Sequence, residues 1–365
     1  MPPRGEGGGA MVVDDAGREY LDLLGGIGAN VLGHAHPAVA AAVSAQGAAA
    51  RPGPDSAAAG PAALLGELLL ALTGPGRVLF TGSGGQAYET ALRVSRRTGR
   101  GEVVTAAGSF PDAPGMTGRP VTQVPFGDVA ALRAAVGGAT AAVVLEPIQG
   151  AYGVVVPPAG YLTAAREICT AAGALLVLDE ARTGLGRTGY WFHHQSEGAE
   201  PDLLTLAGGL GGDRPQGACL AFEAAAELLT PDVPAAAAGG DPLGCAAGLA
   251  VIRTIAGKGL LDHVRRVGDR LRGGIEALAH PLIAGVRGAG LLLGIVLTEP
   301  VAAPVTVRLR AAGFLVEAVQ PAVLRLAPPL ILTAAQADAF VAALPPALGD
   351  VPEAPRVRVL VRDAA

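Results

Sequence analysis

The sequence is poor in charged residues and almost without lysine. Of its 365 residues only 16% are charged, half are apolar, and Lys258 is the one lysine among 27 basic residues. Disorder requires low hydrophobicity and high net charge, so it is excluded for most of the chain. The net charge is −5 and the arginines form no block, which excludes the electrostatic footprint of a nucleic-acid-binding protein.

Cysteines and long apolar runs are also scarce. The three cysteines, Cys169, Cys219 and Cys245, lie far apart and match no metal-binding spacing, so we expect them to be reduced and expect no metal site. No stretch approaches the roughly 20 apolar residues that a membrane-spanning helix needs, and residues 1–10 lack the apolar core of a signal peptide. These absences predict a cytoplasmic protein that binds neither membrane nor nucleic acid.

Helices and strands are expected to alternate after Gly60. The periodicity predicts helices at 62–72, 85–98, 128–136 and 160–172, and strands at 77–81, 102–106, 141–145 and 175–179. The strand sequences AAVVL and LLVL are continuous apolar runs. Such runs are typical of a parallel sheet with helices on both faces.

The pattern changes from about Pro242. Two helices precede short strands and further helices, which predicts a second, smaller α+β domain. The fold class is therefore α/β, with a mostly parallel sheet covered by helices in the large domain. We expect three parts: an N-terminal hairpin and helix that packs with the small domain (1–50), the large α/β domain (51–247) and the small C-terminal domain (248–365).

Two acidic residues follow apolar strands of the predicted sheet. Glu146 comes after AAVVL and Asp179 ends LLVLD, so both side chains should enter the crevice at the carboxyl edge, where open α/β sheets bind ligands. The alternative for either carboxylate, taken alone, is that it caps the turn that follows its strand. A glycine-rich turn at 82–85 separates a strand from a helix, and its amides are suited to a phosphate. A dinucleotide fold is disfavoured there, since no acid ends the next strand.

Several segments resemble the class III aminotransferases, pyridoxal-phosphate enzymes of fold type I, and among them the acetylornithine-type transaminases. The segments include YLDLLGGIGANVLGHAHPAV at 20–39, LDEARTGLGRTG at 178–189 and VLRLAPPLILTAAQADAF at 323–340. The resemblance implies that Asp179 pairs with the pyridinium nitrogen and that the Ser83-Gly84-Gly85 turn holds the phosphate. It also implies that Arg325 binds a substrate carboxylate and that the protein is a two-fold dimer.

The chain departs from the family where the cofactor would be attached. The family's Schiff-base lysine stands in a motif whose counterpart here is TLAGGLGGD, with Gly208 at the lysine position. By the same resemblance Lys258 lies in a surface turn between two helices. Further departures are Gly82, Gln86, Phe110-Pro111, Ala151, Arg182 and Ala235–Ala238. We therefore expect no covalently bound cofactor and at most weak non-covalent binding of pyridoxal phosphate.

Three functions are compatible with these residues. The favoured reading is a homologue that does not perform lysine-dependent transamination and serves as a non-catalytic partner or regulator, as a homodimer or as a heterodimer with an active paralogue. The first alternative is a repurposed enzyme without pyridoxal phosphate, and the second is an acetylornithine-type transaminase. Candidate acid–base residues of a repurposed pocket are Glu146, Asp179, Arg182, Tyr88 and Tyr152. We also expect Arg182 to turn inward and pair with Asp179, and Tyr88 or Tyr152 to narrow the cavity.

Overall fold

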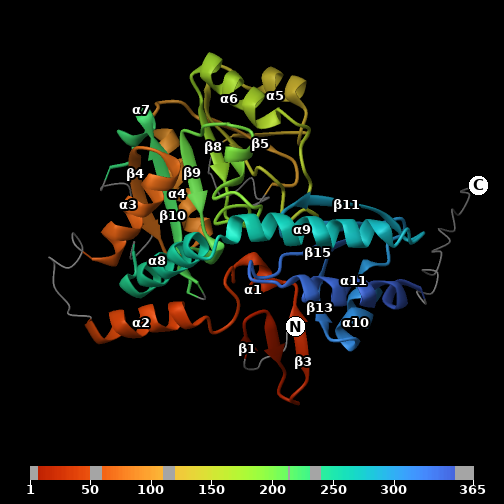
Figure 1. Cartoon of the computed structure of the whole chain (residues 1–365). Helices are drawn as coiled ribbons and strands as arrows, with labels where there is room; N and C mark the ends of the chain where they lie inside the picture. The colour runs from red at the N-terminus through yellow and green to blue at the C-terminus, as the bar shows by residue number, and fades with distance from the viewer. Residues whose placement is uncertain (1–6, 50–59, 110–119, 213, 231–239, 350–365) are drawn as a thin grey trace, which may run out of the picture.

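A seven-stranded sheet forms the centre of the large α/β part (Figure 1). The computed structural model describes residues 7–49, 60–109, 120–212, 214–230 and 240–349. The strand order is β4-β10-β9-β8-β7-β5-β6, and only β10 runs against its neighbours. The strands are β4 (Gly76–Thr81), β5 (Glu102–Ala106), β6 (Val121–Val124), β7 (Thr140–Leu145), β8 (Leu175–Asp179), β9 (Leu203–Leu206) and β10 (Gly217–Phe222).

Helices cover both faces of this sheet, and each face has its own apolar core. One face packs against α3 (Pro61–Thr73), α5 (Val129–Ala135), α6 (Tyr161–Ala172) and α8 (Pro242–Gly257). The other packs against α4 (Gly84–Arg96) and α7 (Glu223–Ala226). The stripe of Tyr161, Ala165, Ile168 and Cys169 buries one side of α6, as its helical spacing predicts.

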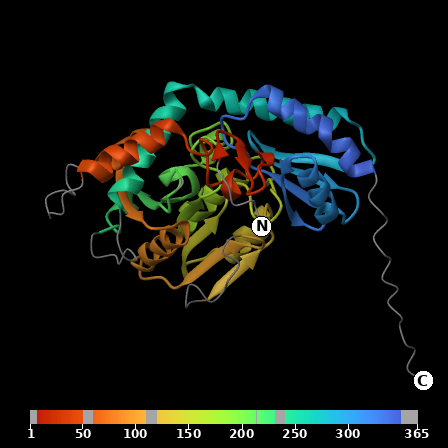
Figure 2. The ribbon, with the colours of Figure 1, turned by 90° about the horizontal axis from the view of Figure 1, so that it is seen from below.

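The C-terminal part contains a four-stranded antiparallel sheet in the order β11-β12-β15-β14. Its strands are β11 (Ile283–Ala289), β12 (Leu292–Leu297), β14 (Glu317–Gln320) and β15 (Val323–Leu326). Its helices are α9 (Leu260–Ala277), α10 (Ala302–Ala311) and α11 (Ala334–Gly349). In Figure 2 the teal α8 and α9 and the blue α11 arch along one side of the molecule.

The N-terminal residues pair with this C-terminal part. A second sheet has the order β1-β2-β3-β13, in which β13 lies parallel to β3. Its strands are β1 (Gly7–Gly8), β2 (Met11–Val13), β3 (Glu19–Asp22) and β13 (Phe314–Leu315), and helices α1 (Gly25–Gly28) and α2 (Pro37–Ala49) follow β3. Leu21, Leu23 and Val31 share one apolar core with α9, α10 and α11.

A buried arginine ties these parts together next to α1. Arg187 is 1% exposed and lies in the loop after β8. Its guanidinium donates hydrogen bonds to the carbonyl oxygens of Leu291 (3.3 Å), Pro328 and Gly28 (3.4 Å). Burial lowers its pKa to about 10, and hydrogen bonds to three carbonyls compensate a charge that would otherwise be costly to bury.

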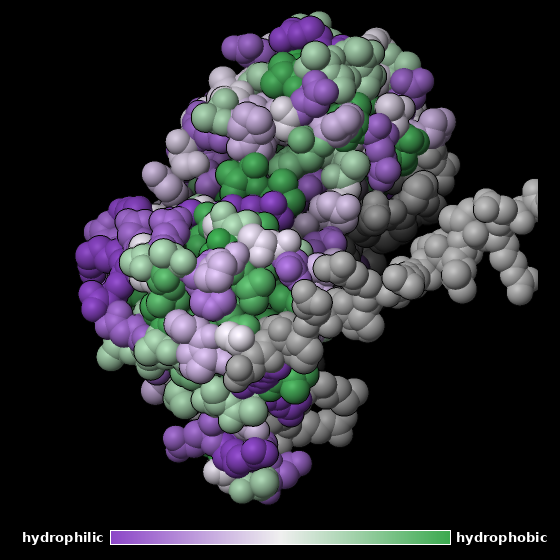
Figure 3. Space-filling model, turned by 90° about the vertical axis from the view of Figure 1, so that its right-hand side faces the viewer, coloured by the Kyte–Doolittle hydropathy of each residue, from purple (hydrophilic) through white to green (hydrophobic). Residues whose placement is uncertain are grey.

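The predicted fold class is confirmed by this architecture and by the structural matches given below. Sequence patterns did not indicate β6, β9 and β10, and α2 extends from Pro37 to Ala49. The predicted departures at 110–111 and 235–238 lie outside the described residues. The face in Figure 3 shows hydrophobic and hydrophilic residues intermixed, as is usual for protein surfaces.

Within the described residues, no single helix is long and apolar enough to cross a membrane. Only α8 and α9 taken together meet the length and composition criteria, and they are bent by 71° at their junction. The same part of the chain gathers no group of three or more His, Cys, Asp or Glu side chains suited to a metal ion.

Candidate functional site

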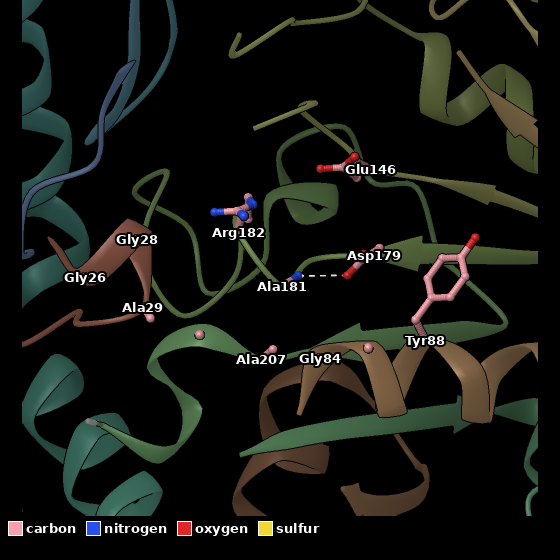
Figure 4. Close-up of a pocket in the computed structure, with 12 residues that line it drawn as sticks. Gly26, Gly28, Ala29, Gly84, Tyr88, Glu146, Asp179, Ala181, Arg182 and Ala207 are labelled. Atoms are coloured by element: carbon pink, nitrogen blue, oxygen red, sulfur yellow. Dashed lines mark hydrogen bonds between the residues drawn. The ribbon is translucent and has the colours of Figure 1, made fainter. Parts of the chain in front are cut away.

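A pocket of about 270 Å³ lies at the carboxyl ends of the parallel strands (Figure 4). Its walls come from α1, the start of α4 and the residues that follow β7, β8 and β9. Because parallel strands end at one edge of the sheet, residues far apart in sequence meet there. The lining includes Gly84, Gly85, Tyr88, Glu146, Asp179, Arg182 and Gly208.

Asp179 is the buried anion of this pocket. It ends β8 and is 8% exposed. Its carboxylate accepts hydrogen bonds from the backbone N–H of Ala181 (3.0 Å) and from Oγ1 of Thr205 (2.8 Å). Burial raises its pKa to about 6, although these hydrogen bonds and the charge of Arg182 act in the opposite direction. The pocket therefore favours a cationic group beside this carboxylate.

The predicted ion pair between Arg182 and Asp179 is wrong. The described partners of the carboxylate are Ala181 and Thr205, and Figure 4 shows Arg182 standing apart from Asp179. The Arg182 side chain instead lies across Gly150, where an added Cβ would come within 2.9 Å of its Cδ. Because Gly150 has no side chain, Arg182 can pack across it. Thr205 on the adjacent strand then forms the side-chain contact with Asp179 that Arg182 was expected to form.

The two tyrosines are placed differently from each other. Tyr88 on α4 is 7% exposed and lines the pocket. Burial, together with the charges of Asp179 and Glu146, raises the pKa of Tyr88, so the phenol keeps its proton. Tyr152 is 52% exposed and covers Gly108 rather than the pocket. The expectation that Tyr152 narrows the cavity is therefore wrong, because its loop directs the ring outward.

The turn before α4 presents backbone amides to the pocket. Ser83 is the N-cap, and its Oγ accepts a hydrogen bond from the backbone N–H of Gln86 (3.3 Å). The Gln86 side chain in turn accepts from the backbone N–H of Gly82 (2.8 Å). This reciprocal capping fixes the start of the helix. The amides of Gly84 and Gly85 belong to its first turn, where the helix dipole favours an anion.

Gly208 starts the 3₁₀ turn Gly208–Gly211 that follows β9. Its φ is +58°, and a Cβ would lie 2.9 Å from the carbonyl oxygen of Ala181. A side chain at this position is therefore strained by both backbone conformation and contact. Lys258, the only lysine of the chain, is exposed at the C-terminal end of α8.

Arg325 is buried on β15, beside the pocket rather than in its wall. It is 4% exposed, forms an ion pair with Glu317 of β14 and donates to the carbonyl oxygen of Gly150 (3.0 Å). Burial and the charge of Arg182 lower its pKa. The two arginines thus meet at Gly150, on the side of the pocket that faces the C-terminal part.

Sequence reasoning missed four residues of this site. Thr205 is the one polar residue in the apolar strand LLTL, and that interruption was a usable signal. Gly28 and Ala29 line the pocket from α1, and only the resemblance at 20–39 drew attention to them. Glu317 has no local signal, because its role depends on the pairing of β14 with β15.

The chain matches the family model "Aminotransferase class-III" over residues 4–112 and 121–348. Among curated proteins, it is 52% identical to an acetylornithine aminotransferase of Streptomyces coelicolor, over 96% of this chain and 92% of that protein. It is also 52% identical to one of Mycobacterium tuberculosis, with the same two coverages.

Solved structures agree with these matches. An acetylornithine aminotransferase from Elizabethkingia anophelis has a TM-score of 0.86 at 29% identity, over 95% of this chain and 93% of that chain. An ornithine aminotransferase from Toxoplasma gondii, described with partial occupancy of pyridoxal phosphate at its active site, has a TM-score of 0.85 at 27% identity, over 95% of this chain and 90% of that chain.

These relatives correct two expectations. The interpretation of the chain as a non-catalytic partner or regulator is contradicted. Relatives that share 52% sequence identity over 96% of this chain are aminotransferases. The expectation of no covalently bound cofactor is contradicted too, since the family uses pyridoxal phosphate. Both expectations gave the residues around position 208 more weight than the pocket as a whole, in which Asp179 and the start of α4 retain a charge pattern suited to this cofactor.

We predict that Asp179→Asn stabilises the protein without added cofactor at neutral pH. The folded state binds the Asp179 proton more tightly than the unfolded chain, so this carboxyl lowers stability as the pH rises from about 4 to about 6. The variant should exceed the wild type by up to about 3 kcal/mol at pH 7 and by little at pH 4. Urea unfolding across this pH range measures the difference; a constant difference would contradict the assignment.

We predict that Gly208→Ala destabilises the protein more than Gly259→Ala. The two glycines have nearly equal φ, +58° and +59°, but only at Gly208 does the new Cβ meet a carbonyl oxygen. The shared backbone conformation costs about 1 kcal/mol in each variant, and the contact adds to it at Gly208. Thermal and urea unfolding compare the two, and equal losses would show that the contact with Ala181 relaxes freely.

Proposed function

Because this chain belongs to the class III aminotransferase family, we propose that it is a pyridoxal-phosphate-dependent aminotransferase of the acetylornithine type. The observation that carries the proposal is the 52% identity to acetylornithine aminotransferases over 96% of the chain. The charge pattern of the pocket supports it, with a buried carboxylate at one end and helix amides at the other.

The residues present fit the two ends of pyridoxal phosphate. Asp179, whose pKa is raised to about 6 by burial, suits the protonated ring nitrogen, since that cation compensates the buried carboxylate. Ser83, Gly84 and Gly85 suit the phosphate. When bound, the cofactor supplies the electron sink that allows an amino group to pass from donor to acceptor.

We infer that Gly208 holds the place of the family's Schiff-base lysine. Proton transfer in the pocket then falls to other side chains, and the two suitable ones in its wall are Tyr88 and Glu146. Tyr88 keeps its phenolic proton because burial raises its pKa, so its Oη serves as the proton donor. Glu146, 4% exposed at the end of β7, serves as the acceptor.

Arg325 is proposed to bind a substrate carboxylate. Its guanidinium already pairs with Glu317, whose side chain is 37% exposed. A substrate carboxylate therefore reaches Arg325 by sharing or displacing Glu317, which loses little because it returns to water.

The assembly and the division of the chain are also proposed. A two-fold dimer is supported by α2, an apolar helix none of whose 13 residues is buried in the single chain. The pairing of β3 with β13 supports a small unit composed of 1–50 and 248–365 beside the large domain at 51–247. The three cysteines, free and buried, support a cytoplasmic location.

The proposed dimer predicts that light scattering gives twice the 36.1 kDa chain mass. A monomer at micromolar concentration would refute the dimer.

We predict amino transfer from acetylornithine to a 2-oxo acid that requires added pyridoxal phosphate. Tyr88→Phe should lower kcat by at least about tenfold with a smaller change in KM, because it removes the proton donor. Tyr152→Phe is the matched control, since that ring is exposed outside the pocket, and should leave both constants unchanged. Chromatographic detection of the amino-acid product measures the reaction. No product with any acceptor, or equal rates for Tyr88→Phe and wild type, would contradict the proposal.

A further inference from the structure

A second cavity of about 400 Å³, here called the side cavity, adjoins the pocket. The two share part of their walls: Gly26, Ala29, Gly84, Ala207 and Gly208 line both. The side cavity continues past the start of α4 to the turn between β9 and β10. A ligand that begins at Asp179 can therefore extend past Gly84 into this second space.

The two spaces differ in charge. The pocket contains Glu146 and Asp179, whereas none of the described residues that line the side cavity is acidic. Its charged and titratable side chains are Arg214 and His34. The combined space is thus suited to a molecule with a cationic group at one end and an anionic group at the other.

An unpartnered donor is buried in the wall of the side cavity. Asn30 is 6% exposed, and its Nδ2 is buried with no hydrogen-bond partner among the described residues. Leaving such a donor unpaired is costly, and native structures seldom do so without a ligand or water to accept it. Gly84, from the first turn of α4, lines the same cavity, so a residue with an unpaired side-chain donor and the start of a helix lie in one wall.

Arg214 adds a charge to these donors. Its Nε forms an ion pair with Asp241 at 3.2 Å, and its side chain is 41% exposed. Asp241 is the N-cap of α8 and is not among the residues that line the cavity. The planar guanidinium has further N–H groups on its other edge, and such an edge suits the paired oxygens of a phosphate.

We propose that Arg214 and Asn30 bind the phosphate of pyridoxal phosphate from within the same chain, together with the amides at the start of α4. This inference rests on the proposed function and adds the residues that distinguish the phosphorylated cofactor from its dephosphorylated form. Asp179 determines where the ring nitrogen lies, and Arg214 neutralises the charge at the opposite end.

Binding of pyridoxal phosphate and of pyridoxal tests this role without reference to catalysis. Equilibrium dialysis with absorbance detection gives a Kd for each compound with the purified full-length chain. Arg214→Ala should weaken pyridoxal phosphate by about 10- to 100-fold, the effect of losing a hydrogen bond to a charged group, and should change pyridoxal by less than about twofold. Asn30→Asp should act in the same direction, because it places an anion against the phosphate.

Two control variants separate this role from a structural one. Asp241→Asn removes the ion pair but keeps an N-cap side chain on α8, and should leave the Kd for pyridoxal phosphate unchanged or lower. Arg253→Ala, at an exposed position of α8 outside both cavities, should have no effect. Arg214→Lys, which keeps the charge, should recover part of the affinity.

Each outcome decides the proposal. Selective loss of pyridoxal phosphate binding in Arg214→Ala supports it. Equal binding by Arg214→Ala and wild type, or equal loss for both compounds, overturns it while leaving the proposed function intact. If the wild type binds neither compound, the proposed function and this inference fail together.

Discussion

The burial of the Asp179 carboxylate is the constraint on which the pocket depends. Its position at the end of β8 follows from the parallel sheet, and two hydrogen bonds only partly compensate the loss of water. Burial leaves the pKa near 6, so the folded protein holds a carboxyl that is stabilised by a cation. The elements α1 and α4 and the turns after β7 and β9 enclose a space around this carboxyl in which a cationic group can bind.

Much of this arrangement could be predicted from the sequence. Continuous apolar strands predicted the parallel sheet, and the acids that follow two of them predicted the crevice. The glycine-rich turn before α4 predicted the anion end. These features depend on local periodicity and on the geometry of strand ends, which a single sequence expresses directly. The strands β9 and β10 were missed because the glycine-rich segment between them obscures their length.

The failures concern long-range contacts and the weight given to one position. The path of Arg182 depends on the absence of a side chain at Gly150, some 30 residues away in sequence, and no periodicity records such a contact. The outward orientation of Tyr152 likewise depends on a contact with a residue distant in sequence, Gly108. The functional interpretation gave more weight to the glycine at position 208 than to the rest of the pocket, whereas relatives at 52% identity are aminotransferases. On the proposed correspondence of Gly208 with the family's lysine, we propose that proton transfer depends on Tyr88 and Glu146, which line the pocket.

The most direct test of this account is the protonation of Asp179 with and without cofactor. Carbon-13 NMR of labelled aspartate carboxyls, assigned by comparison with Asp179→Asn, gives the titration of this group alone. The account predicts an apparent pKa near 6 in the free protein and a decrease of at least about one unit on addition of pyridoxal phosphate, because the ring cation stabilises the carboxylate. An Asp179 pKa that is unchanged by saturating cofactor would contradict the central claim.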